Sequence, residues 1–174
     1  AVFAWNFCLA AVCGNSIIWK PSPHSNGCAK GIKDAWDKVS GEFSDLILIL
    51  EGGNEEAVFI CEDNRISLVS ATGSTQMGKE LAPLVSARLG KLLLELGGNN
   101  AAIVCPSADL DLTIKGIAFS ACGTTGQRCT SLRRLFVHQD IYKDCVERLQ
   151  KCFDDLIIGC PSEDSSQIGP LISK

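Results

Sequence analysis

The sequence predicts an α/β fold in which parallel strands alternate with helices. Short runs rich in isoleucine, leucine and valine alternate with segments of helical periodicity along most of the chain. Glycine and proline turns bound these runs, and no internal repeat or low-complexity linker interrupts them. Strands separated by helices of this length are typical of βαβ units, whose parallel sheet is covered by helices on both faces.

The elements follow in order from local pattern. Apolar runs such as SIIWK, LILIL and KLLLEL predict strands at residues 16–20, 46–50, 66–70, 91–96, 101–104 and 133–138. Helical spacing predicts helices at residues 22–39, 74–89, 107–121 and 140–156. Gly14 is expected to end an earlier helix near Cys13, and Gly90 to end the helix that begins near Ser74. Pro83 lies inside that helix and predicts a kink or an interruption.

Composition excludes several classes of protein. With 46% hydrophobic and 21% charged residues among 174, the chain resembles an ordered globular protein rather than a disordered one. Its net charge of −4 and the lack of a basic run argue against nucleic-acid binding. The longest apolar runs are too short to span a bilayer, so no membrane partner is expected. The apolar start has no basic residues of a signal peptide, which predicts a cytoplasmic location and leaves a mitochondrial one open.

The chain contains ten cysteines but no CxxC pair. This spacing argues against a zinc centre, and no metal ligand is predicted. The cysteines fall mostly in apolar periodic segments, whereas disulfide frameworks belong to small loop-rich secreted domains. Buried, reduced thiols of an intracellular protein are therefore expected.

Cys129 is the candidate nucleophile. It lies in the segment GQRCT, between a glycine-containing turn and a strand. Backbone N–H groups and the neighbouring Arg128 are expected to lower its pKa and favour the reactive thiolate. The alternative from local context is a structural thiol without a chemical role.

Glu95 is the candidate general base. It lies in an otherwise apolar strand just before a Gly-Gly turn, where burial is expected to desolvate its carboxylate and raise its pKa. The alternative is a glutamate at a strand end that reaches solvent or caps a backbone N–H.

Two further segments are candidate ligand sites. In SATGSTQMG a strand enters a turn at Gly73, and Ser74 can cap the following helix, whose free N–H groups suit a phosphate. Lys20 lies at the carboxyl end of the first predicted strand, where doubly wound sheets bind ligands. The alternatives are an ordinary capped turn and a surface lysine.

Taken together, these segments resemble the aldehyde dehydrogenase superfamily. ELGGNN and GQRCT resemble its two active-site signatures, TGSTQMG its cofactor turn and GNSIIWKP its adenosine-ribose strand. The antiquitin branch, the α-aminoadipic semialdehyde dehydrogenases, is the closer match through ELGGNNAAIV and GTTGQRCTSLRRLFVH. The resemblance covers essentially the whole chain, but only a central portion of a longer family chain.

The resemblance implies a residue-by-residue chemistry. Cys129 attacks the aldehyde to give a thiohemiacetal, oxidation gives a thioester, and Glu95 activates the water that releases the acid. Cofactor binding falls to Lys20, Gly73, Ser74 and Leu96. Arg128 resembles the antiquitin arginine that holds the distal carboxylate of an acidic semialdehyde. The implied cofactor is NAD, with NADP left open, and the parent protein is expected to be a homo-oligomer.

The resulting prediction has two parts. Residues 1–95 form a Rossmann-like cofactor domain without its N-terminal part, and residues 96–174 form an incomplete α/β catalytic domain. The predicted function is an NAD(P)-dependent aldehyde dehydrogenase acting on an aldehyde such as α-aminoadipic semialdehyde. One alternative is a catalytically silent relative that binds a dinucleotide or serves in interactions, and another is a cofactor-independent thiol esterase.

Overall fold

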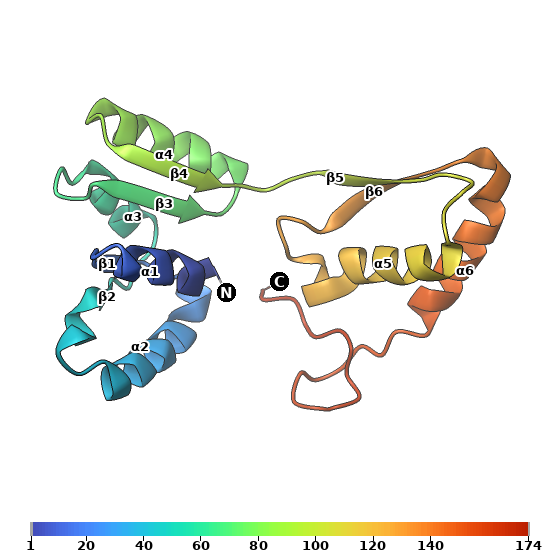
Figure 1. The fold of residues 1–174 in the computed structure, drawn as a ribbon, viewed down its shortest axis with the longest axis horizontal. Coiled ribbons are helices and arrows are strands. Elements are labelled where there is room, and N and C mark those ends of the chain that lie inside the picture. The colour runs from blue at the N-terminus through green and yellow to red at the C-terminus, as the bar shows by residue number, and fades with distance from the viewer. Residues whose placement is uncertain (1, 174) are drawn as a thin grey trace. The chain divides into compact units, whose positions relative to one another are not determined.

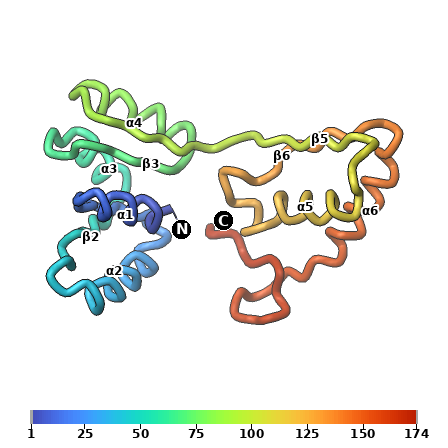
Figure 2. Tube along the Cα trace, in the orientation of Figure 1, coloured from blue at the N-terminus to red at the C-terminus, as the bar shows by residue number. Residues whose placement is uncertain are grey.

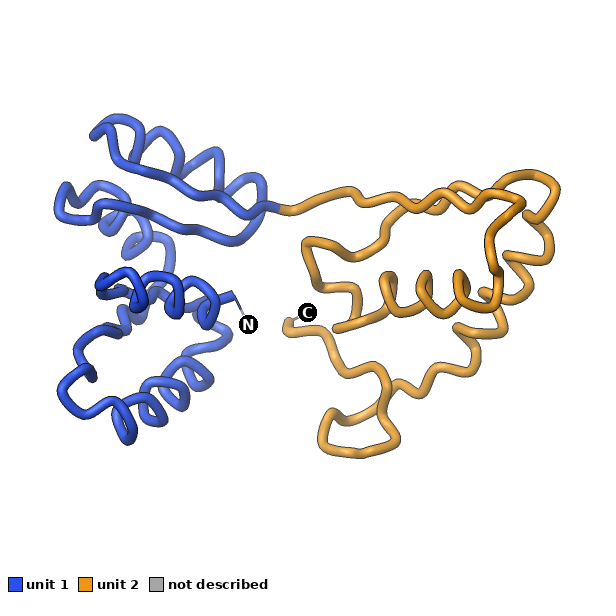
Figure 3. Tube along the Cα trace, viewed as in Figure 1, with its two compact units in different colours: residues 1–96 blue, residues 97–174 orange. Residues whose placement is uncertain are grey.

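A computed structural model describes residues 2–173 of the chain. The chain divides after Leu96 into two compact units, Ala1–Leu96 and Gly97–Lys174, coloured separately in Figure 3. The predicted boundary lies one residue earlier. The cofactor and catalytic roles assigned to the two parts stay predictions.

The first unit contains two βαβ modules (Figure 1). Its helices are α1 (Val2–Val12), α2 (Asn26–Ser40), α3 (Asn54–Glu62) and α4 (Thr75–Ala87). Its strands are β1 (Ile17–Trp19), β2 (Ile47–Ile49), β3 (Leu68–Thr72) and β4 (Lys91–Glu95). Short 3₁₀ turns lie at Pro23–Ser25 and Gly41–Leu46.

The second unit contains a third βαβ module followed by one more helix. Its elements are β5 (Asn100–Val104), α5 (Leu110–Cys122), β6 (Leu132–Val137) and α6 (Tyr142–Asp154), with 3₁₀ turns at Gly123–Gly126 and Gln139–Ile141. The α/β fold class predicted from the sequence is confirmed, because all three strand pairs are parallel and each pair is joined through a helix.

The strands pair two by two, as β1 with β2, β3 with β4 and β5 with β6. The helix between two paired strands packs on one side of the pair, which we call the inner face of that module. The tube in Figure 2 shows α4 running along β3 and β4. The inner faces form the cores. In the first unit, Val69, Leu81 and Val85 pack with Cys61 of α3. In the second, Val104 packs with four buried residues of α5 and α6: Ile114, Ile117, Cys145 and Leu149.

The expectation that helices cover both faces of the strands is wrong for these modules. Side chains alternate across a strand, so every second residue points away from the covering helix. On that outer side lie apolar side chains that are exposed by 44% or more: Ile18 and Leu48, Leu68 and Leu93, and Ile103 and Phe136. Each module therefore buries one apolar face and leaves the other open.

Local capping signals set most helix ends. Gly14 adopts φ +76°, and the N–H groups of Gly14 and Asn15 donate to the carbonyls of Ala11 and Ala10, which closes α1 as predicted. Asp109 accepts from the Leu112 N–H at 3.2 Å and begins α5. The predicted stop at Gly90 is displaced by one residue, because Leu89 adopts the left-handed conformation that ends α4.

Two features of the first unit differ from the sequence prediction. The α3 helix, Asn54–Glu62, was not predicted, since its apolar residues follow one another in a single run and its helical hydrophobic periodicity is weak. The α4 helix continues past Pro83 to Ala87, so the proline does not interrupt it. Packing of Leu81 and Val85 against β3 and β4 stabilises the helix on both sides of Pro83.

The ten cysteines are all free, but the expectation that they are buried holds for few of them. Only Cys61 and Cys145 are buried, and burial raises the pKa of both thiols. Six are exposed: Cys8, Cys13, Cys28, Cys105, Cys129 and Cys160. Among the helices of residues 2–173, none has the length and apolar character needed to cross a membrane.

Candidate active site

In the first unit, Glu95 and the predicted cofactor turn are neighbours. The parallel register pairs Glu95 of β4 with Thr72 of β3. The next residue, Gly73, donates its N–H to the carbonyl oxygen of Glu95 at 3.0 Å. Two segments that the sequence singled out separately therefore meet at the carboxyl ends of adjacent parallel strands, where α/β sheets bind ligands.

Ser74 caps α4 as predicted. Its Oγ accepts a hydrogen bond from the Met77 N–H at 3.0 Å. The N–H groups of Thr75 and Gln76, in the first helical turn, have no acceptor within the helix. A helix of 13 residues beginning directly after a strand thus presents N–H donors and the positive end of its dipole.

Leu96 contacts α4 at Gly78. A Cβ built on Gly78 would lie 2.7 Å from a methyl carbon of Leu96, so a larger residue here would require the Leu96 side chain to move. Leu96 thereby fixes the chain after Glu95 against the start of the helix. Its predicted contact with a cofactor stays a prediction.

The expectation that burial desolvates Glu95 is wrong. Glu95 is exposed, because the alternation of β4 places it on the uncovered face with Lys91 and Leu93. Leu92 and Leu94, the half-buried positions of β4, lie on the inner face that α4 covers. The carboxylate is therefore accessible for chemistry but is not held in an apolar pocket.

Lys20 joins the ends of β1 and β2. Its Nζ donates to the carbonyl oxygens of Pro21 at 3.0 Å and of Gly52 at 3.3 Å. These bonds hold the half-buried ammonium group at the carboxyl ends of two parallel strands. Its predicted role toward a ribose stays a prediction.

In the second unit, Cys129 lies in a turn between the 3₁₀ segment Gly123–Gly126 and β6, and its side chain is exposed. Thr124, Thr125 and Gly126 precede the turn with φ of +52°, +57° and +65°. Left-handed backbone is costly for β-branched residues and is found where the surrounding structure imposes it, often at functional sites.

The turn itself is closed by Ser131, which is 1% exposed. The Ser131 Oγ accepts from the Arg128 N–H at 3.1 Å, and the Ser131 N–H donates to the Arg128 carbonyl at 3.2 Å. These two bonds order the backbone on both sides of Cys129. Among the hydrogen bonds of residues 2–173, none reaches the Cys129 Sγ, so the expected N–H donors do not point at the sulfur here.

The guanidinium group of Arg128 contacts two neighbouring side chains. Its Nε donates to Thr124 Oγ1 at 2.9 Å, and its guanidinium carbon lies 5.1 Å from the ring centre of Phe119. An arginine with one hydrogen bond and one aromatic contact retains further N–H donors for a carboxylate. Its predicted role in substrate binding stays a prediction.

One residue beside the turn was not predicted. The side-chain amide of Asn100 donates to the carbonyl oxygens of Cys129 at 2.7 Å and of Ser131 at 3.0 Å. The available signal was an asparagine at the start of an apolar strand, where a polar side chain requires partners.

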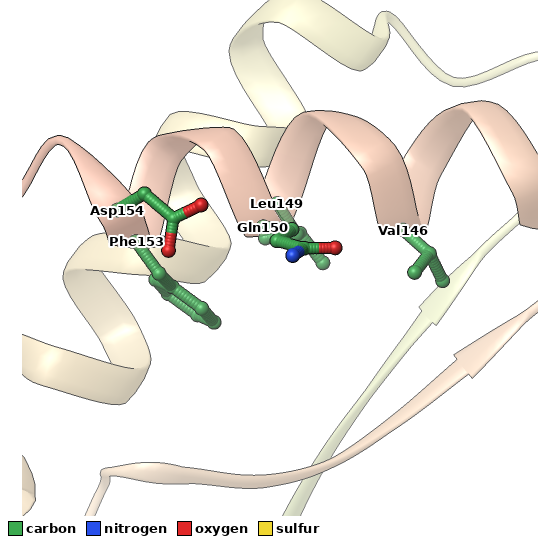
Figure 4. Close-up of a pocket in the computed structure, with 5 residues that line it drawn as sticks. All are labelled: Val146, Leu149, Gln150, Phe153 and Asp154. Carbon is green, nitrogen blue, oxygen red and sulfur yellow. The ribbon is translucent and has the colours of Figure 1, made fainter.

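Two surface hollows lie elsewhere in the second unit. The first follows one face of α6, and Figure 4 shows its lining side chains: Val146, Leu149, Gln150, Phe153 and Asp154. The second is lined by residues of α5, β6 and α6. Neither lining includes Cys129, and both are open, mainly apolar depressions, so we assign no chemistry to them.

Comparison with known proteins gives one consistent result. The model of the aldehyde dehydrogenase family matches residues 1–174. α-Aminoadipic semialdehyde dehydrogenase of Bos taurus is 40% identical over 182 residues, which is 100% of this chain and 33% of that protein. Plant relatives at similar identity are named aldehyde dehydrogenase family 7 member A1, and the chain spans about a third of the length of these curated relatives.

Solved structures agree with this result. An NAD-dependent aldehyde dehydrogenase from Sinorhizobium meliloti has a TM-score of 0.85 at 27% identity, over 91% of this chain and 32% of that one. An NADP-dependent enzyme of Escherichia coli has a TM-score of 0.86 at 28% identity, over 90% of this chain and 33% of that one. The predicted resemblance of the chain to this family is confirmed. The chain belongs to the aldehyde dehydrogenase family.

Proposed function

We propose that the protein carrying this chain oxidises an aldehyde to the carboxylic acid with a nicotinamide dinucleotide. The observation that carries the proposal is the family match across residues 1–174, together with an exposed Cys129 on a turn whose backbone is hydrogen-bonded on both sides. An accessible thiol on an ordered backbone suits a nucleophile, whereas a structural thiol is normally buried.

The residues of the first unit fit a dinucleotide. The N-terminus of α4 offers the free N–H groups of Thr75 and Gln76, and the Gly73–Ser74 turn brings the chain to them without a bulky side chain. Lys20 supplies a cation at the carboxyl ends of β1 and β2. When bound, the dinucleotide supplies the acceptor for the two electrons removed from the substrate. NAD is the proposed cofactor, and solved relatives of both kinds leave NADP as the alternative.

Two side chains carry the proposed covalent chemistry. The Cys129 thiolate adds to the aldehyde carbon to form a thiohemiacetal, and oxidation of that adduct leaves a thioester on the same sulfur. The Glu95 carboxylate takes a proton from the water that attacks the thioester, which releases the acid and restores the thiol. This division of labour requires the exposed carboxylate described above to reach the acylated cysteine.

We further propose an acidic semialdehyde as the substrate class. Arg128 precedes the nucleophile, and its guanidinium has N–H groups beyond the one given to Thr124. A planar guanidinium can pair with a carboxylate through two parallel hydrogen bonds. The bovine relative is named for α-aminoadipic semialdehyde, an aldehyde that carries a carboxylate.

The decisive experiment follows reduced dinucleotide in the presence of aldehyde and NAD⁺ or NADP⁺. We expect reduction that depends on aldehyde and that is abolished in Cys129→Ala. Cys105→Ala is the matched control, because Cys105 is an exposed cysteine of the same unit and is expected to leave the rate unchanged. Glu95→Gln is expected to stop the reaction at the thioester, which mass spectrometry detects as an adduct on the Cys129 peptide.

The alternatives give different outcomes. Binding of a dinucleotide without turnover indicates a catalytically silent relative. Cleavage of an ester by Cys129 without a dinucleotide indicates a thiol esterase. For the substrate class, Arg128→Gln is expected to raise the KM for an acidic semialdehyde about tenfold or more and to leave the KM for a neutral aldehyde unchanged. Lys115→Gln, at an exposed position of α5, is the charge-matched control.

A further inference from the structure

The side-chain amide of Asn100 has no role in the chemistry described above, yet it bridges two distant segments. Asn100 begins β5, and its two hydrogen bonds reach residues 29 and 31 positions later in the chain. Their acceptors are the carbonyl oxygens of Cys129 and Ser131, at 2.7 and 3.0 Å. An asparagine amide has two N–H donors, so both are used on the nucleophile turn.

The neighbouring chain is shaped for this contact. A Cβ built on Gly98 would lie 3.2 Å from the Cys129 carbonyl oxygen and 2.9 Å from Asn100 Oδ1. A side chain at position 98 would therefore push the turn away from the amide. Gly98 leaves the space that allows the two segments to approach.

The register of the strands supports the same arrangement. Asn100 pairs with Leu132, but Ala101 pairs with Arg134, so the ladder shifts by one residue at this point. A bulge of this kind redirects the chain at the end of a strand. Arg134 adds a second tie, since its guanidinium donates to the carbonyl of Asn99 at 2.7 and 3.2 Å.

We propose that Asn100 is a positioning residue for the nucleophile, whose amide holds the Arg128–Ser131 turn in the conformation in which Cys129 reacts. This inference rests on the proposed function for its catalytic consequence. The ordering of the turn by the two hydrogen bonds does not rest on the proposed function, because it can be measured without any catalytic activity. Together with the two bonds between Ser131 and Arg128, the amide restrains the turn at four of its oxygens: the carbonyls of Arg128, Cys129 and Ser131 and the Ser131 hydroxyl.

The test compares Asn100→Asp and Asn100→Ala with Asn99→Asp and Asn99→Ala in the full chain. Aspartate keeps the shape of asparagine but replaces both donors with acceptors, so it repels the two carbonyls. Asn99 is exposed and its side chain makes none of these contacts, which makes it the matched control. Amide hydrogen exchange of residues 128–131 reports the order of the turn, and steady-state kinetics report its effect on the reaction.

We expect both Asn100 variants to speed exchange of residues 128–131 about tenfold and to lower kcat by a similar factor, with the KM for aldehyde unchanged. Both Asn99 variants should match the wild-type chain. Unchanged exchange in the Asn100 variants overturns the proposal. Faster exchange with an unchanged kcat also overturns it, because Asn100 then supports the fold without positioning the nucleophile.

Two further measurements keep the outcome decisive. If the Asn100 variants do not fold, Ser131→Ala tests the same restraint, since it removes the hydroxyl that accepts from Arg128. If the wild-type chain does not turn over aldehyde, the rate of Cys129 alkylation by iodoacetamide across pH replaces kcat as the readout. The pH dependence of the Cys129 alkylation rate is measured relative to that of Cys160 in the same sample. The proposal then requires that this pH dependence change in the Asn100 variants and stay constant in the Asn99 variants.

Discussion

Leu89 occupies the position after α4 that glycine usually fills. Its φ is +58°, and its N–H and that of Gly90 donate to the carbonyls of Ser86 and Val85, both at 3.0 Å. This is the Schellman arrangement, in which a left-handed residue ends the helix. The Leu89 side chain is 94% exposed, so it gains little from packing in return for the strained backbone.

Leu89→Gly is therefore expected to stabilise the chain by about 1 kcal/mol, because glycine adopts the left-handed region without a Cβ clash. Urea unfolding measures the change as a higher midpoint at a constant m-value. Val39→Gly is the control, since Val39 is 80% exposed but lies within α2. That control should lose stability, and a Leu89→Gly midpoint at or below the wild-type value contradicts the prediction.

Cys160 differs chemically from the other exposed thiols. Its Sγ lies 3.0 Å from Ser162 Oγ, and hydrogen bonds from the Ser162 side chain and backbone lower the pKa of the Cys160 thiol. A lower pKa means a larger thiolate fraction near neutral pH. The same hydrogen bonds need no substrate or cofactor, so this reactivity is separate from that of Cys129.

Ser162→Ala is expected to move the pH dependence of Cys160 alkylation toward higher pH, because the thiolate loses the hydroxyl donor. Peptide mass spectrometry after iodoacetamide labelling follows each cysteine separately. Ser165→Ala, in the same exposed segment, is the control and should leave the profile unchanged. Identical profiles for wild-type and Ser162→Ala chains would show that the hydroxyl does not act on the thiolate.

Each βαβ module has an apolar outer face. On β5 and β6, Ile103 and Phe136 are register partners and are 76% and 54% exposed. Their neighbours in sequence, Ala102, Val104, Leu135 and Val137, face the helices, as strand alternation requires. Patches of this kind bind apolar probes in proteins whose cores are otherwise closed.

Replacing both Ile103 and Phe136 by threonine is expected to reduce the fluorescence of the dye ANS while leaving the helical circular dichroism intact. Threonine keeps the preference for strands, so the ladder should persist. The control replaces Leu171 and Ile172 by threonine, because both are exposed but lie outside any strand or helix. Equal ANS fluorescence of the two double variants would show that the dye does not bind at Ile103 and Phe136.

The chain as a whole consists of two units with separate cores. The cluster around Val69 and Val85 belongs to Ala1–Leu96, and the cluster around Val104 and Cys145 belongs to Gly97–Lys174. Every strand pairs within its own unit. A unit with its own core and its own strand pairs has the minimum required to fold independently.

Residues 97–174 expressed alone are therefore expected to keep the structure of the second unit. Their amide NMR spectrum should overlay that of the same residues in the full chain, apart from residues near position 97. Residues 1–96 provide the reciprocal measurement. A collapsed spectrum for residues 97–174 would show that the second core depends on the first unit.

The amino-acid sequence by itself determined the α/β class, the position of most elements, the helix ends at Gly14 and Ser74, and the membership of the family. These follow from signals within a few residues of one another: apolar periodicity, capping side chains and short motifs. The tertiary structure alone decided that Glu95 lies on an open strand face and that Asn100 holds the Cys129 turn. Burial and side-chain partners depend on segments that lie far apart in the chain, such as Asn100 and Cys129, which are 29 positions apart. No local pattern encodes them.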